Sequence, residues 1–90
     1  MNVFLTGASS GIGAALAAEF ARRGAVLGLV ARRRAPLDEI VARVPGRHHV
    51  YAVDVTDKDA LIAAGRAFDD ASGGADIVVA NAGMSVGVLT

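Results

Sequence analysis

The chain of 90 residues contains no cysteine and no tryptophan, and it has only two prolines. Without cysteine, neither a disulfide nor a thiolate metal site can form. The two histidines, His48 and His49, are adjacent, and neighbours on a strand face opposite ways, so we expect no metal site. No apolar run approaches the ~20 residues of a membrane span. No basic stretch followed by an apolar segment marks a secretory signal at the N-terminus. We therefore expect a cytoplasmic protein that does not contact a membrane.

Charge of neither sign is in excess, because nine Lys and Arg balance nine Asp and Glu. Their distribution is uneven: residues 1–50 hold seven Arg and three acidic residues, and residues 51–90 hold two basic and six acidic residues. A nucleic-acid-binding domain is more often basic overall, so we expect no nucleic-acid partner. The length fits one small domain or part of one, and the 53% hydrophobic content argues against disorder.

A glycine-rich run, TGASSGIG, occupies residues 6–13 directly after the short apolar segment 3–5. Gly7, Gly11 and Gly13 have the spacing G-x-x-x-G-x-G where a buried strand must turn into a helix. Glycine permits left-handed backbone angles and close approach to a ligand, and the N-terminus of a helix attracts anions. The run predicts a cradle for a nucleotide diphosphate. A tight turn with close helix–strand packing would use the same residues.

Apolar periodicity along the chain alternates between strand and helix patterns. In the first helix, Ile12, Leu16 and Phe20 would form one stripe, and residues 84–90 show no clear pattern. We expect strands over residues 3–6, 25–31, 49–55 and 77–80, and helices over residues 12–23, from about 36 to 44, and from about 58 to 71.

This alternation predicts an α/β fold with a parallel, doubly wound sheet. Right-handed crossovers place the four strands, numbered along the chain, in the spatial order 3-2-1-4. The carboxyl ends of the strands then share one rim, which carries the glycine-rich run, Arg32, Asp54 and Asn81. Ligands of such sheets bind where the strand order reverses, here between strands 1 and 4.

The residues after the second strand distinguish two dinucleotide cofactors. An NAD site places Asp or Glu about 20 residues past the glycines to bind the ribose 2′-OH. This chain instead reads Arg32, Arg33 and Arg34, with no acidic residue before Asp38. Arginine grips a 2′-phosphate with a planar fork of donors, so the cluster favours NADP(H) over NAD(H). Arg32 is the first candidate and Arg33 the second, unless the arginines only solvate a loop. Flavin and S-adenosyl-methionine are disfavoured, since neither carries a 2′-phosphate.

Two further rim positions are candidates for cofactor contacts. Asp54 can accept a hydrogen bond from an adenine amino group, or it can cap the turn before the next helix. Asn81, followed by Ala82 and Gly83, ends the fourth strand. Small residues there would let a ribose lie against the backbone, and the Asn81 amide could join neighbouring strand ends. The alternative is a simple turn, in which Asn and Gly are common.

The segments TGASSGIG, LVARR, DV and NAG, in this order and at these intervals, resemble the N-terminal half of a short-chain dehydrogenase/reductase. The resemblance covers nearly the whole chain and implies a Rossmann-like domain with NAD(P)-dependent oxidation of an alcohol or reduction of a carbonyl. It implies that Arg32 meets the 2′-phosphate and that Asp54 and Val55 meet the adenine. The residues implied for the pyrophosphate and nicotinamide side are Gly7, Ser9, Ser10, Ile12 and Gly13, and those for the ribose are Asn81, Ala82 and Gly83.

The chain departs from the family pattern at two cofactor positions. Many NADP-using members carry a basic residue just before the second glycine, where this chain has Ser10, so the NADP(H) prediction depends on Arg32. The family often reads NNAG, and here Ala80 replaces the first Asn while Asn81 is kept.

The catalytic Ser, Tyr and Lys of the family have no counterparts in these 90 residues. The family spaces its Tyr and Lys as Y-x-x-x-K, whereas Tyr51 and Lys58 are seven residues apart, and Ser85 comes too early in the order of elements. We therefore expect residues 1–90 to be the cofactor-binding part of an NADP(H)-dependent oxidoreductase, inactive by itself. Contacts with substrate and any homo-oligomer interface would come from later elements.

Two alternatives stay open. A non-catalytic module that binds NADP(H) would be folded and monodisperse. A truncated fragment with no independent function would expose the apolar strand 77–80 as an edge, which invites pairing or aggregation.

Overall fold

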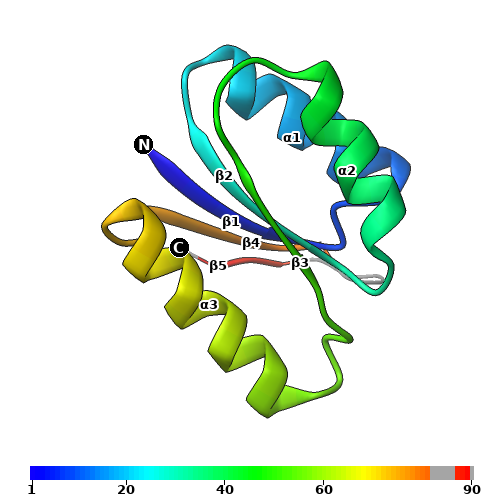
Figure 1. The fold of residues 1–90 in the computed structure, drawn as a ribbon, viewed down its shortest axis with the longest axis vertical. Helices are drawn as coiled ribbons and strands as arrows, with labels where there is room; N and C mark the ends of the chain where they lie inside the picture. Colours follow the sequence, from blue (N-terminus) through cyan, green and yellow to red (C-terminus); the bar gives the residue numbers. More distant parts are fainter. Residues whose placement is uncertain (82–86, 90) are drawn as a thin grey trace.

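The computed structural model describes residues 1–81 and 87–89, which form one five-stranded sheet with helices on both faces (Figure 1). The strand order is β3-β2-β1-β4-β5. The first four strands are parallel and β5 is antiparallel to β4, so the predicted order 3-2-1-4 and the Rossmann-like α/β fold are confirmed. The strands are β1 (Asn2–Thr6), β2 (Val26–Ala31), β3 (His49–Ala52), β4 (Ile77–Ala80) and β5 (Gly87–Leu89); the helices are α1 (Gly11–Arg22), α2 (Arg34–Arg43) and α3 (Lys58–Ser72).

The two faces of the sheet are covered unequally (Figure 1). Helices α1 and α2 cover one face, which we call the two-helix face, and α3 covers the other, the one-helix face. Strands β1 and β2 are buried on both sides, which explains their near-continuous apolar sequences. Successive residues point to opposite faces: Val3 and Leu5 pack on the two-helix face, and Phe4 packs on the one-helix face.

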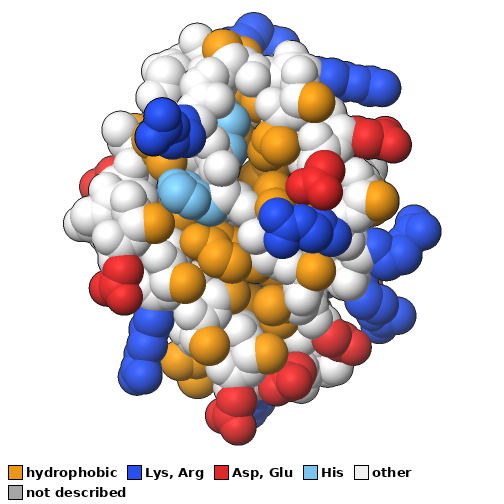
Figure 2. Space-filling view, viewed as in Figure 1, with side chains coloured by type: hydrophobic (Ala, Val, Ile, Leu, Met, Phe, Trp, Pro, Cys, Tyr) orange, Lys and Arg blue, Asp and Glu red, His pale blue; other side chains and the backbone are white. Residues whose placement is uncertain are grey.

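The one-helix face leaves apolar surface open. An open groove between β3 and α3, lined in part by Val50, Tyr51 and Ala63, lies beside this face. Figure 2, viewed from the same side as Figure 1, shows apolar side chains open to view along β3 and between the helices that flank it. Val78 of β4 is 39% exposed and Ile62 of α3 is 54% exposed. A single helix therefore does not close this side of the sheet.

The first helix packs through small residues. Gly13, Ala17 and Ala21 recur every four residues and are buried against the sheet, with Leu16 and Phe20 packed beside them. The expected stripe is wrong at Ile12, which is 69% exposed. Position 12 is one residue, and so about 100°, away from the buried row that starts at position 13.

The structure and the sequence prediction differ by more than one residue at three places. β3 ends at Ala52 rather than at residue 55, so Asp54 lies in the following turn. α2 begins at Arg34, two residues before Pro36. Residues 87–89, where no pattern was found, form β5 and pair with β4. The unpaired edge that the truncated-fragment alternative implied for strand 77–80 is therefore absent from the described residues, because β5 pairs with β4 there.

Within the described residues, no helix combines the length and the apolar character that a membrane crossing requires. No group of three or more His, Cys, Asp or Glu side chains among residues 1–81 and 87–89 could hold a metal ion.

Candidate functional site

The turn between β1 and α1 forms a compact cradle at the carboxyl edge of the sheet. Gly7 has a φ of 68°, in the left-handed region that glycine adopts without strain. The Ala8 N–H donates to the Val30 carbonyl at 3.1 Å, which fixes the turn against the end of β2. Ser10 is the N-cap of α1: its Oγ accepts from the Gly13 N–H at 3.1 Å and donates to the Gly7 carbonyl at 3.0 Å.

The glycines of the run have different structural roles. A Cβ on Gly13 would lie 2.2 Å from the Gly7 carbonyl oxygen and 2.9 Å from the Ala8 Cα, so this position needs glycine for close packing of α1 on the turn. A Cβ on Gly11 would meet no atom within 4 Å. Close helix–strand packing, the alternative explanation of the run, therefore accounts for Gly13 and leaves Gly11 unexplained.

Asn81 completes the cradle from the far side of the sequence. Its Nδ2 donates to the Ser10 Oγ at 3.0 Å and to the Gly7 carbonyl at 3.4 Å. The Ser10 hydroxyl thus donates one hydrogen bond and accepts two, which uses its full capacity. Ser9 and Ser10 are both exposed, but the Ser10 hydroxyl is engaged within the cradle by these hydrogen bonds. Ala82 and Gly83 lie outside the described residues.

A small open pocket of about 120 Å³ lies next to the cradle, at the ends of β1, β2 and β3. It brings together residues from three separate segments of the chain. Its lining consists of Gly7, Ser9, Ala31, Arg32, Val53, Asp54 and Val55.

Arg32 and Asp54 form an ion pair across this pocket. The Arg32 Nη2 lies 3.6 Å from the Asp54 Oδ2, and the two side chains are 76% and 42% exposed. The Asp54 Oδ1 accepts hydrogen bonds from the Thr56 N–H at 2.9 Å and from the Thr56 hydroxyl at 2.7 Å. These two bonds lower the pKa of the Asp54 carboxyl, and the nearby Arg32 guanidinium lowers it further. Asp54 is therefore a carboxylate at neutral pH.

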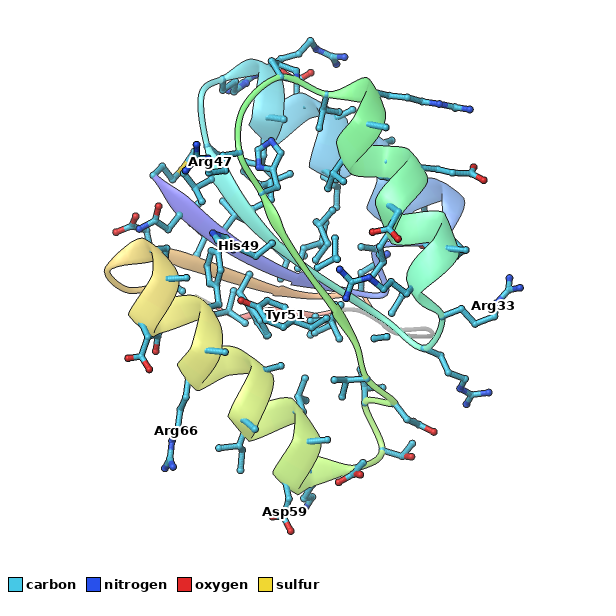
Figure 3. All side chains as sticks on the ribbon, viewed as in Figure 1. Arg33, Arg47, His49, Tyr51, Asp59 and Arg66 are labelled. Carbon is cyan, nitrogen blue, oxygen red and sulfur yellow. The ribbon has the colours of Figure 1, made fainter. Side chains whose placement is uncertain are left out.

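The other arginines of the cluster are placed differently. Arg33 is the N-cap residue of α2, and its side chain extends away from the sheet (Figure 3). Arg34 lies 3.6 Å from Asp38 on the same helix, one turn away. Arg32 is thus the arginine of the cluster that lines the pocket. Thr56, which fixes Asp54, was missed as a site residue; the D-x-T spacing of an Asx turn was its signal in the sequence.

The family model for the short chain dehydrogenases matches residues 1–90. The chain belongs to the short-chain dehydrogenase family. An uncharacterized oxidoreductase of Mycobacterium bovis is 40% identical to it over 91 residues, which covers 93% of this chain and 26% of the relative. The chain therefore spans about a quarter of the length of that relative.

Two solved structures show the same arrangement of strands and helices. L-sorbose reductase from Gluconobacter frateurii, in complex with NADPH and L-sorbose, is 37% identical with a TM-score of 0.83 over 98% of this chain and 35% of that one. The 3-ketoacyl-(acyl-carrier-protein) reductase from Brucella melitensis, in complex with NADH, is 28% identical with a TM-score of 0.80 over 86% of this chain and 32% of that one. Family membership therefore supports a nicotinamide dinucleotide as ligand. One of these two neighbours was solved with NADPH and the other with NADH.

Proposed function

We propose that this chain forms the NADP(H)-binding part of a short-chain oxidoreductase that oxidises an alcohol or reduces a carbonyl. The observation that carries the choice of cofactor is the exposed Arg32 guanidinium in one pocket with Gly7 and Ser9. The sequence offers no acidic residue at the end of β2 to bind a free 2′-OH. A guanidinium at this position suits the 2′-phosphate of NADP(H).

The cradle supplies the other half of the fit. Helix α1 has no acidic residue in its first turn, so its unpaired N–H groups and positive dipole end are not opposed by a carboxylate there. Gly7 and Gly13 hold the turn close to the helix without side chains in the way. We assign the pyrophosphate and the nicotinamide side of the cofactor to this cradle, with Gly7, Gly13, Ser9 and the exposed Ile12 next to the ligand. Ser10 belongs to the same site as the residue that holds the turn through its hydrogen bonds. The adenine is assigned to Asp54 and Val55, and the ribose to Asn81, Ala82 and Gly83.

The bound cofactor would supply the hydride, and the protein would orient it. Proton transfer needs a group that these residues do not offer. Tyr51 lies on β3 with its ring 6.3 Å from the ring of Phe4, and burial raises the pKa of its hydroxyl, opposite to what a proton donor near neutral pH requires. Lys58 is the first residue of α3. We therefore propose that residues 1–90 bind the cofactor without turning it over.

The test is a calorimetric titration of the chain with NADPH and, separately, with NADH. We expect the chain to bind NADPH more tightly. Arg32→Ala should lose about tenfold to a hundredfold in NADPH affinity, since a hydrogen-bonded charge contributes about 1.5–3 kcal/mol. Its NADH affinity should change little.

Arg33→Ala is the matched control, because it removes the same charge from a side chain that extends away from the sheet. It should leave the ratio of NADPH to NADH affinity nearly unchanged. Equal weakening of NADPH and NADH in Arg32→Ala would count against the assignment, as would the absence of binding by a chain that circular dichroism shows to be folded.

A further inference from the structure

The two carboxylate oxygens of Asp54 have separate partners. Oδ1 accepts from the backbone and the hydroxyl of Thr56, and Oδ2 faces the Arg32 guanidinium at 3.6 Å. The Asp57 N–H also donates to the Asp54 carbonyl at 2.9 Å, which closes the turn. The carboxylate is therefore fixed on one side by a hydrogen-bonded turn and open to the pocket on the other.

Arg32 is held much less firmly than Asp54. Charge-assisted N–H···O bonds are usually about 2.7–2.9 Å long, so a separation of 3.6 Å is an ion pair without a close hydrogen bond. The Arg32 side chain is 76% exposed, and exposed ion pairs contribute little to holding a side chain in place. A ligand in the pocket can therefore take the guanidinium, while the carboxylate stays where Thr56 holds it.

These two groups carry the charge of the pocket. Among the residues that line it, Arg32 and Asp54 are the ones with charged side chains. The neighbouring Arg34 is paired with Asp38 along α2, and Asp57 is engaged as the N-cap of α3 through the Ala60 N–H. The charge that a bound 2′-phosphate meets beside Arg32 is therefore that of Asp54.

We infer that Asp54 is a specificity-determining residue, which limits the preference for NADP(H) over NAD(H) by competing with the 2′-phosphate for Arg32. The inference rests on the proposed function. A phosphate group carries a charge of about −1.5 to −2 at pH 7, and it must draw the guanidinium away from a fixed carboxylate and remain near that carboxylate. NAD(H) has a neutral 2′-OH and does not enter this competition. Asp54 therefore opposes NADP(H) selectively.

The test measures NADPH and NADH affinities of Asp54→Asn by the same calorimetric titration. Asparagine keeps a side-chain oxygen for the two Thr56 donors, so the turn is retained and the charge is lost. We expect the ratio of NADPH to NADH affinity to rise by about threefold to tenfold, the scale of an exposed ion pair plus the relief of repulsion. The ratio is the quantity to compare, because both cofactors carry the same adenine and a lost adenine contact would weaken both affinities equally.

Asp57→Asn is the matched control. It removes the same charge three residues further along, and asparagine is as good an N-cap as aspartate, so α3 should be unaffected. Its affinity ratio should stay at the value of the unmodified chain. In the double variant Arg32→Ala/Asp54→Asn the gain should shrink to the part that comes from the relief of repulsion, because no guanidinium is left to compete for.

Several results would overturn the inference. An unchanged ratio in Asp54→Asn would mean that Asp54 meets the shared adenine or serves only the turn. A lower ratio would mean that Asp54 prepares Arg32 for the phosphate. A gain of undiminished size in the absence of Arg32 would exclude competition for the guanidinium. Failure of the proposed function is distinguishable, since it shows as no NADPH preference in the unmodified chain or no loss of it in Arg32→Ala. If the unmodified chain and Arg32→Ala behave as proposed but Asp54→Asn does not, the inference about Asp54 is wrong and the proposed function stands.

Discussion

The two faces of the sheet differ in how completely they are closed, although the same strands form both. Among the described residues, the two-helix face has ten buried members in its apolar cluster, including Leu5, Leu29 and Leu37. The one-helix face has four: Phe4, Val30, Ala64 and Phe68. The glycine cradle is built on the first face through α1, whereas Val53 and Val55, which line the same pocket, pack against the cluster of the second face.

This difference indicates on which face a substitution should cost more stability. A pocket of about 350 Å³ opens between α3 and the sheet, next to Phe4, Gly65 and Val78. Each buried group on the one-helix face therefore carries a larger share of the packing than its counterpart opposite. Changes to that face should cost more stability than similar changes to the two-helix face.

Loss of Phe68 should have the largest effect. Its side chain is fully buried, and its ring lies 5.7 Å from the ring of Phe4 and 6.0 Å from that of His49. Phe68→Ala should lower the free energy of unfolding by about 3–5 kcal/mol. Leu37→Ala, on the two-helix face, should cost less, within the usual range of about 2–5 kcal/mol. Urea unfolding followed by circular dichroism measures both, and an equal or greater loss in Leu37→Ala would contradict the comparison.

A methyl group at Gly28 should have an intermediate effect. A Cβ at this position of β2 would lie 2.6 Å from the Phe68 Cδ1, so the ring would have to move. Gly28→Ala should cost about 1–3 kcal/mol of unfolding free energy by overpacking. Gly65→Ala is the matched control on α3, where a Cβ meets no atom within 4 Å, and it should stabilise the protein by about 0.5–1 kcal/mol. The Tm should therefore fall in Gly28→Ala and rise in Gly65→Ala. A Tm of Gly28→Ala that does not fall would show that the Phe68 ring moves aside without cost.

The smallest effect concerns the charges at the end of α1. Glu19 accepts from Arg22 at 2.7 Å and from Arg23 at 2.8 Å, and these bonds lower the pKa of its carboxyl. A lowered pKa contributes stability above the ordinary carboxyl pKa of about 4.3, and this contribution is lost as the pH falls through the lowered value. Glu19→Gln should therefore be slightly less stable than the unmodified chain at pH 7, and the difference should vanish in acid. Glu39→Gln on α2 is the control, and a difference that does not shrink with falling pH would rule out the ion pairs as its source.

The order of the parallel strands could be predicted from the sequence because it depends on the alternation of strand and helix and on the handedness of crossovers. The glycine run could be placed for the same reason, since it follows an apolar strand. β5 could not be predicted: residues 87–89 have no period of their own and form a strand by pairing with β4. Such a strand forms because of its contact with another strand, and the apolar periodicity of its own sequence carries no information about that contact.

The candidate site was predicted as a set of residues and not as a set of interactions. Arg32 and Asp54 were both expected at the rim, but their pairing depends on where the turn after β3 places the carboxylate. Thr56 determines that placement, and the sequence marks it by the D-x-T spacing alone. Ser9 and Ser10 were equivalent candidates until the N-cap separated their roles.

The hydrogen bonds of Asn81 have a consequence for how the molecule assembles. They connect positions that are 71 and 74 residues apart, so the chain must close a long loop before the turn at Gly7 and Ser10 is complete. The glycine run can adopt its left-handed turn locally, yet its final hydrogen bonds come from the end of β4. The geometry of the cradle is thus a property of the folded sheet that is complete only when β4 has docked, and a nucleotide that binds there would select chains in which it has.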